Sequence, residues 1–321
     1  PRSTLFPYTT LFRSSIINLR GLTITNSSLA LNLAGTSNAA VLNNVIFTDN
    51  VSAITVDGSE VTLNNVVIDN AGSKANTVTS SGLINVNASE ISSLFTNTGV
   101  VNINDGSVVS NIVNSNEVNT KGTVTLSGVN NGTVTFTGNI VLTGELTGNG
   151  QIYAASANYN LNAAKISNNT FNLSSGKLVF GVDTFKNINK LDATGGTIDF
   201  AENEISTYNI SKLVSSADVD YILNINITDP DNITVDKFNL GTTSDGVVTI
   251  AGLNGITRET VSSDYSQNIV VLENAGNAVI ALDPTLAESL RTTYEVTSYK
   301  QGGVYEITNK TFIGTKGIML K

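Results

Sequence analysis

The stretch Leu42-Asn-Asn-Val-Ile-Phe-Thr-Asp-Asn50 returns about 21 residues later, in nearly the same form, as Leu63-Asn-Asn-Val-Val-Ile-Asp-Asn70. A weaker copy precedes both, at Asn18-Leu-Arg-Gly-Leu-Thr-Ile-Thr-Asn26. Similarity at a fixed interval of about 20 to 50 residues is typical of solenoids, in which each repeat is too small to bury its apolar face alone. The sequence therefore predicts stacked coils of about 21 residues.

The sequence around these repeats is typical of short β-strands. Segments such as Leu22-Thr-Ile-Thr25 and Gly122-Thr-Val-Thr-Leu126 alternate apolar residues with Thr, which is the period of a half-buried strand. Pairs such as Asp57-Gly58 and Asn131-Gly132 separate them and favour tight turns. Because the repeat spans several strands, we expect an all-β solenoid and not a meander of hairpins.

Asn is unusually frequent, with 43 residues among 321. If neighbouring coils are in register, Leu42 and Leu63 stack inside the core. The pairs Asn43-Asn44 and Asn64-Asn65 then lie at one turn, where their amides can form ladders along the stack. The Asn content is thus explained by structure alone.

Composition excludes several functions. Only 13% of residues are charged, the formal net charge is -9 and the pI is near 4.5, so we expect binding to neither nucleic acid nor an anionic membrane surface. The chain has no Cys, His or Trp, which rules out disulfides and thiolate sites and removes the commonest general base and metal ligand. No apolar run approaches the roughly 18 residues of a membrane-spanning helix, so we expect no such helix. We also expect no cofactor.

We predict four parts along the chain. Residues 1–14 are similar to a translated sequencing adapter and are set aside as an artefact. Residues 15–150 are predicted to form a regular solenoid, and residues 151–282 a less regular continuation, because charged residues rise from 11 in the former to 30 from Gln151 onward. Residues 283–321 are predicted to hold a helix and a hairpin and to stop at a truncated C-terminus.

The last part carries the one clear helix signal. Asp283 is a suitable N-cap, Pro284 suits the first helical position, and good helix formers follow, so we predict a short helix near 284–291. The segment from Tyr294 to Ile307 predicts a hairpin that turns at Gly302-Gly303.

The stretch Thr135-Phe-Thr-Gly-Asn-Ile-Val-Leu-Thr-Gly-Glu-Leu-Thr-Gly-Asn-Gly150 resembles the passenger regions of bacterial autotransporters and related surface adhesins. Ser175-Gly-Lys-Leu-Val-Phe180 and Thr194-Gly-Gly-Thr-Ile-Asp-Phe200 are similar to such passengers as well, and the likeness covers most of residues 15–281. The resemblance implies a right-handed parallel β-helix, secreted to the bacterial cell surface, with a membrane β-barrel normally following at the C-terminus.

An enzymatic alternative rests on Asp49 and Asp69. If these two carboxylates occupy equivalent positions of adjacent coils, they lie about 4.8 Å apart, close to the separation that retaining glycosidases use. Each is followed by Asn at an expected turn, where Asp commonly bonds its own backbone. Arg20 is the sole Arg in the first coils. We therefore expect both Asp residues to form turns and predict no catalytic residues.

Two further groups of residues suggest binding. Asp229-Pro-Asp-Asn232, with Asp236 nearby, gathers oxygen atoms that suit calcium, but no EF-hand pattern accompanies them and we expect a solvated turn between two strands. Tyr153 and Tyr159 could form an exposed aromatic patch, but we expect them to pack in the core. The sequence predicts no metal site.

These observations lead to three functional hypotheses. The first is a cell-surface adhesin or rigid spacer, which binds host glycans or surface proteins and meets the membrane only through an anchor or barrel outside this sequence. The second is a carbohydrate-active β-helix lyase or hydrolase. The third is a structural stalk without a ligand.

Overall fold

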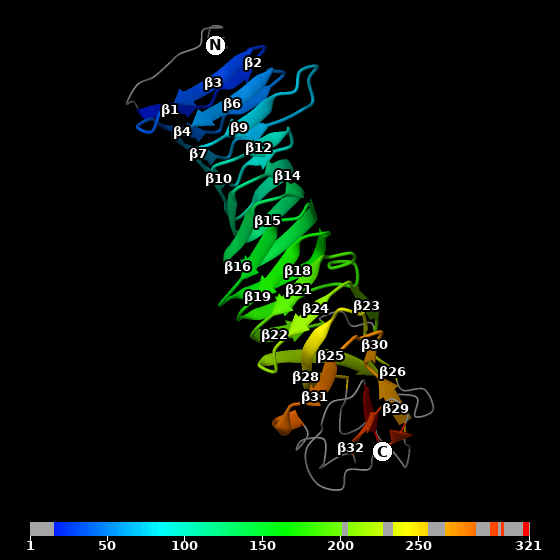
Figure 1. Ribbon diagram of the computed structural model, residues 1–321. Helices are drawn as coiled ribbons and strands as arrows, with labels where there is room; N and C mark the ends of the chain where they lie inside the picture. Colours follow the sequence, from blue (N-terminus) through cyan, green and yellow to red (C-terminus); the bar gives the residue numbers. More distant parts are fainter. Residues whose placement is uncertain are drawn as a thin grey trace. The chain divides into compact units, whose positions relative to one another are not determined.

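The computed structural model describes residues 16–200, 205–226, 234–255, 267–286, 296–300, 303–304 and 317–320. The chain forms two compact units: unit 1 ends at Tyr153, and unit 2 begins at Ala154. Almost all described residues with regular structure lie in β-strands (Figure 1).

Unit 1 is built of short strands up to β13, followed by three longer ones of 8, 14 and 15 residues. They are β1 (Ile16–Arg20), β2 (Thr23–Thr25), β3 (Leu29–Ala34), β4 (Ala39–Asn43), β5 (Ile46–Thr48), β6 (Ser52–Asp57), β7 (Glu60–Asn64), β8 (Val67–Ile68), β9 (Thr77–Ser80), β10 (Leu83–Asn87), β11 (Glu90–Ile91), β12 (Phe95–Asn97), β13 (Val100–Ile103), β14 (Ser107–Asn114), β15 (Glu117–Asn130) and β16 (Thr133–Thr147); β17 (Gln151–Ala154) crosses the boundary.

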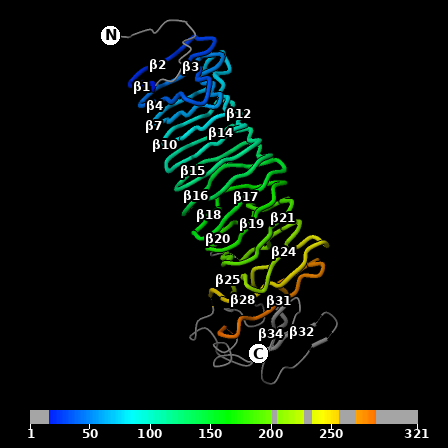
Figure 2. The backbone as a smooth tube through the Cα atoms, turned by 60° about the vertical axis from the view of Figure 1, so that its left-hand side comes forward, coloured from blue at the N-terminus to red at the C-terminus, as the bar shows by residue number. Residues whose placement is uncertain are grey.

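Parallel pairing stacks these strands into three faces. The first face is β1-β4-β7-β10-β13, the second is β2-β5-β8-β11, and the third is β3-β6-β9-β12. Strand β14 continues both the second and the third faces, and β15 and β16 pair along almost their whole lengths. Figure 2 shows the successive coils as turns of the tube. The predicted β-solenoid is confirmed.

The register confirms the repeat and shows where its period changes. Strand β7 follows β4 by 21 residues, as the repeat predicts, and Asn43 is the register partner of Asn64. The offset from β7 to β10 is 23 residues, and the offset from β10 to β13 falls to 17. Later coils are shorter because their strands run through the corners with fewer loop residues between them, as in β15 and β16.

The core is made by the inward residues of each coil. Leu42 and Leu63 are register partners on β4 and β7, and both are completely buried. Larger side chains such as Phe47 and Phe95 are also fully buried. Since each apolar side chain lies on its equivalent in the next coil, burial depends on stacking, as expected for a repeat that cannot stand alone.

Amide ladders follow the turns, as predicted. Asn64 Nδ2 donates to Asn43 Oδ1 at 3.0 Å, and Asn65 Nδ2 donates to Asn44 Oδ1 at 2.6 Å. Asn87 extends the first ladder by donating to Asn64 Oδ1 at 2.8 Å. Asn44 and Asn65 have φ of 54° and 51°, a left-handed conformation that Asn tolerates better than most residues.

A second ladder is fully buried. Asn97 Nδ2 donates to Asn114 Oδ1, and Asn114 Nδ2 donates to Asn130 Oδ1, both at 2.8 Å. None of the three side chains is exposed to solvent. Their amides also bond nearby backbone groups, for example the carbonyl oxygen of Glu117 at 3.0 Å from Asn97 Nδ2. The ladder therefore satisfies polar groups inside the core.

The described strands of unit 2 are less regular. They are β18 (Asn158–Ile166), β19 (Thr170–Leu173), β20 (Lys177–Val179), β21 (Lys190–Ala193), β22 (Gly196–Asp199), β23 (Thr207–Ile210), β24 (Leu213–Ser215), β25 (Val219–Asn226), β26 (Thr234–Val235), β27 (Lys237–Leu240), β28 (Asp245–Asn254), β29 (Gln267–Val270), β30 (Leu272–Glu273), β31 (Val279–Leu282), β32 (Val296–Lys300), β33 (Gly303–Val304) and β34 (Gly317–Leu320).

Unit 2 also stacks parallel strands, in the order β18-β20-β22-β25-β28-β31. The coils of unit 2 contain more residues toward the C-terminal end. Strands β18 and β20 pair across a short interval of sequence, whereas β28 and β31 pair across a much longer one. Aromatic rings fill the core of the unit. The ring of Phe180 lies 4.8 Å from that of Phe185 and 5.0 Å from that of Phe200.

The described end of the chain contains the predicted helix start. Residues 284–286 are helical, and Asp283 Oδ1 accepts the N–H groups of Thr285 at 2.8 Å and Leu286 at 3.2 Å, which makes Asp283 the N-cap. Residues 287–291 of the predicted helix lie outside the described residues. Strands β32 and β33 pair antiparallel, where the sequence predicts a hairpin. Within the described ranges, no helix has the length and apolar character needed to cross a membrane.

Candidate binding groove

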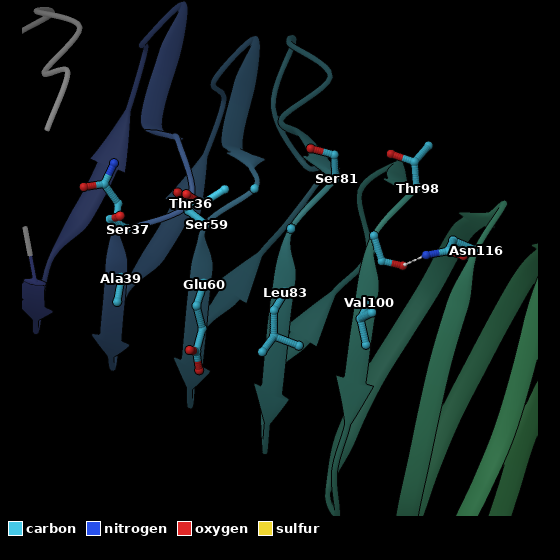
Figure 3. A pocket seen from close by; sticks show the side chains of 14 residues that line it. Thr36, Ser37, Ala39, Ser59, Glu60, Ser81, Leu83, Thr98, Val100 and Asn116 are labelled. Atoms are coloured by element: carbon cyan, nitrogen blue, oxygen red, sulfur yellow. Dashed lines mark hydrogen bonds between the residues drawn. The ribbon is translucent and has the colours of Figure 1, made fainter. Parts of the chain in front are cut away.

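An open groove of about 770 Å³ runs across five coils of unit 1. It follows the turns that join the third face of one coil to the first face of the next. We call these turns the turn row and represent them by Ser81, Thr98, Ser115 and Asn131, which begin the turn in successive coils. Figure 3 shows the side chains that line the groove. They are Thr36, Ser37, Asn38, Ala39, Ser59, Glu60, Ser81, Leu83, Thr98, Val100 and Asn116, with glycines 58, 82 and 99.

Close backbone stacking forms the floor of the groove. The N–H of Leu83 donates to Ser59 O at 2.8 Å, and the N–H of Val100 donates to Gly82 O at 2.9 Å. A Cβ at Gly99 would lie 2.1 Å from Gly82 O, so no side chain fits there. Glycine at these turns keeps the floor open and lets the coils approach each other.

Polar side chains along the turn row direct their hydrogens toward the protein. Ser81 Oγ donates to Asp57 Oδ1 at 2.9 Å, and Thr98 Oγ1 donates to Ser80 O at 3.1 Å. Asn116 Nδ2 donates to Gly99 O at 3.0 Å, the bond drawn in Figure 3. Each hydroxyl uses its single hydrogen in these bonds, so its oxygen lone pairs remain to accept a hydrogen bond from a ligand. The side-chain carbonyl oxygen of Asn116 can also accept. The groove is therefore rich in acceptors.

The charge of the groove is weakly negative. Glu60 is exposed on β7, where its carboxylate accepts a 3.0 Å hydrogen bond from Asn85 Nδ2. None of the fourteen lining residues is basic or aromatic. This arrangement favours a neutral ligand that donates hydrogen bonds, and it disfavours an anionic one.

The predicted pairing of Asp49 with Asp69 is wrong. Ile46 pairs with Val67 and Phe47 with Ile68, which places Thr48 beside Asp69. Thr48 Oγ1 donates to Asp69 Oδ1 at 2.9 Å. In the register of β5 and β8, the position beside Asp49 belongs to the residue that follows Asp69. The two carboxylates therefore do not lie side by side.

Asp49 lies at a turn, as predicted, but its carboxylate holds a loop of the next coil and not its own backbone. Its Oδ1 accepts the N–H of Ser73 at 2.8 Å, the hydroxyl of Ser73 at 3.0 Å and the N–H of Lys74 at 3.0 Å. The hydrogen bond from the Ser73 side chain, followed by the two backbone bonds and the charge of Lys74, lowers the pKa of Asp49 from its usual value of 3.8. Its φ of 51° is left-handed.

The calcium hypothesis falls largely outside the described residues, which omit Asp229, Asp231 and Asn232. Asp236 is buried, and its carboxylate accepts the N–H of Ser206 at 2.9 Å and the N–H of Asn224 at 2.6 Å. Asp236 thus binds backbone donors. In the part of the chain that the structure describes, no three acidic side chains gather in a way that could hold a metal ion.

The two tyrosines differ. Tyr159 is buried with 1% exposure, as predicted, whereas Tyr153 is 45% exposed, so the prediction that Tyr153 packs in the core is wrong. Arg20 is exposed on β1, where its register partner is Asn43. Neither Tyr153 nor Arg20 belongs to the groove.

Sequence reasoning missed the groove itself. Its signal was present as small turn residues at a shorter interval: Gly82, Gly99 and Asn116 follow one another by 17 residues, and Gly132 comes 16 later. This shorter interval cannot be recognised from the Leu42 and Leu63 copies, which are 21 residues apart.

No family model matches the chain, and neither the curated proteins nor the solved structures contain a significant match.

Proposed function

We propose that the chain is part of a cell-surface adhesin whose unit 1 binds a neutral, polyhydroxylated chain such as a glycan along the groove. The observation that supports this proposal best is the orientation of the groove's own donors. Ser81 and Thr98 donate their only hydroxyl hydrogens to protein acceptors, so a ligand that bonds these two oxygens must supply the hydrogens. Sugar hydroxyls do so.

The repeat of the turn row suits a polymer. Stacked strands are about 4.8 Å apart, so each coil offers one small polar group at that interval. An extended sugar chain presents its hydroxyls at a comparable interval and can contact several coils at once. Many weak contacts in series raise the affinity of the whole chain above that of one unit.

Charge supports the choice of a neutral ligand. Glu60 lies on the groove, and Asp57 accepts the hydroxyl of Ser81 beside it. A uronate or sulfated polymer would bring like charges toward these carboxylates, which costs binding energy.

The stacked coils also support a spacer role. Their repeated ladders extend by adding coils, which is the construction expected of a stiff support. Location at the cell surface rests on the resemblance to autotransporter passengers. The lyase or hydrolase alternative was suggested by a pair of adjacent carboxylates. That pair does not form, because Asp69 is paired with Thr48 and not with Asp49.

Binding of the purified full chain to a glycan array that contains neutral and anionic polymers tests the proposal. We expect neutral glycans to bind and uronate polymers to bind at least about tenfold less tightly, a difference of about 1.4 kcal/mol. Thr98→Arg places a long side chain over the groove and should abolish binding. Thr79→Arg, at an exposed position of β9 that does not line the groove, is the matched control.

Two results would overturn the glycan proposal. One is the absence of binding to every neutral glycan, which would favour the stalk. The other is an equal loss with Thr98→Arg and Thr79→Arg, which would place the binding elsewhere.

A further inference from the structure

Unit 1 contains two Asn-Gly pairs, Asn131-Gly132 and Asn149-Gly150, in neighbouring coils. Both asparagines are exposed. Asn-Gly is the sequence in which a backbone nitrogen most easily reaches the preceding side-chain amide, because glycine has no Cβ to obstruct it. The two pairs therefore allow a comparison of the same chemistry in two environments.

The backbone nitrogens of the two glycines differ. The N–H of Gly150 donates to Asn130 O at 2.8 Å, and Gly150 is buried. At the equivalent turns of earlier coils, the N–H of Gly99 is held by Asn97 Oδ1 at 3.0 Å and that of Asn116 by Asn114 Oδ1 at 3.2 Å. Among the described residues, the N–H of Gly132 has no such hydrogen bond.

The side-chain amide of Asn131 is also polarised by the next coil. Its Oδ1 accepts the N–H of Asn149 at 3.2 Å. When a nucleophile attacks Cγ of Asn131, negative charge develops on this oxygen. A backbone N–H that already points at the oxygen stabilises that charge without rearrangement.

We propose that Asn131 is a site of spontaneous deamidation in the folded protein, whereas Asn149 is protected. The backbone nitrogen of Gly132 attacks Cγ of Asn131 and loses its proton, the new C–N bond closes a succinimide, and the Cγ–Nδ2 bond breaks to release ammonia. Water then opens the ring to aspartate or isoaspartate. The product adds one negative charge to the turn row, which is uncharged at Ser81, Thr98 and Ser115. This inference does not depend on glycan binding.

Peptide mapping by mass spectrometry tests the proposal. The full chain is incubated at mildly alkaline pH, once folded and once unfolded in urea, and the deamidated fraction at each asparagine is followed with time. In the folded chain we expect Asn131 to react at least about tenfold faster than Asn149, the factor that corresponds to one hydrogen bond of about 1.4 kcal/mol. In urea the two rates should converge, because both sites have the same Asn-Gly sequence.

An unmodified Asn131 in the folded chain would overturn the proposal, and so would equal rates at the two sites before unfolding. Asn131→Gln serves as the control variant, because its longer side chain disfavours the five-membered ring. It should lack the charge variant that isoelectric focusing detects in the aged parent protein.

Discussion

Asn97 donates its side-chain amide to Asn114 at 2.8 Å, and water reaches neither side chain. Such a pair is stable in the core because both amides also bond backbone groups: Asn97 Nδ2 donates to Glu117 O at 3.0 Å, and Asn114 Oδ1 accepts the N–H of Asn116 at 3.2 Å. The same arrangement makes the centre of the ladder sensitive to substitution, since Asn114 both accepts from Asn97 and donates to Asn130.

We predict that Asn114→Ala destabilises unit 1 by about 2–4 kcal/mol, because it removes the two buried ladder bonds that Asn114 makes with Asn97 and Asn130. Hydrogen exchange at the backbone amides of the surrounding coils measures this loss locally. Asn102→Ala is the matched control: Asn102 is also central to a ladder, between Asn85 and Asn119, but is partly exposed. It should cost about 1 kcal/mol or less. Equal effects would show that burial of the ladder does not matter.

Gly99→Ala should disrupt the turn row. The added Cβ would lie 2.1 Å from Gly82 O, so the neighbouring coils must separate. We expect a loss of stability at the upper end of single substitutions, about 4 kcal/mol, read as a lower melting temperature. At Gly138, an added Cβ meets only the flexible side chain of Lys121 at 3.6 Å. A Gly138→Ala variant as unstable as Gly99→Ala would contradict this account.

The loop held by Asp49 should respond to acid. Because the folded pKa of Asp49 lies below its usual value of 3.8, the carboxylate stabilises the loop above that value and loses this effect as the pH falls through the folded pKa. Exchange protection of the Ser73 and Lys74 amides should therefore fall below about pH 4. Asp49→Asn keeps an acceptor oxygen but does not titrate as the carboxylate does, so its protection should change little over the same range. A parallel decline in both proteins would assign the effect elsewhere.

In unit 2 we predict that Phe180→Ala costs about 3–5 kcal/mol, since it removes a buried ring that contacts several others. Its neighbours include Phe185, Phe200 and Tyr208. Phe180→Leu, which keeps most of the volume, should cost clearly less. The measurement is the near-ultraviolet circular dichroism of the aromatic side chains in unit 2, followed as the protein is heated. Equal losses for the two variants would argue against ring packing as the cause.

The sequence predicted most of unit 1 because the repeat contains its own register. Leu42 and Leu63 are adjacent in the core, and Asn43 and Asn64 are bonded, as their alignment required. The error over Asp49 arose where the second copy is one residue shorter between its apolar run and its Asp. Strand pairing follows the apolar positions, so a shift of one residue places a different side chain on the same spot.

The groove was harder to foresee. Its floor depends on the distance between backbones at Gly82 and Gly99, and that distance is set by how the coils stack. In unit 2 the interval between paired strands widens along the chain, since Asn158 pairs with Lys177 but Val247 pairs with the more distant Val279. No single period therefore marks the strands that become neighbours.

The Asn ladders have a consequence for the environments in which this fold persists. Amide side chains neither titrate in the ordinary pH range nor carry net charge, so dissolved salt does not screen their mutual attraction as it screens ion pairs. We therefore expect the ladder of Asn43, Asn64 and Asn87 to be as stable at high salt as at low salt. A scaffold held by such contacts should be insensitive to dissolved salt, unlike the ion pairs between charged side chains.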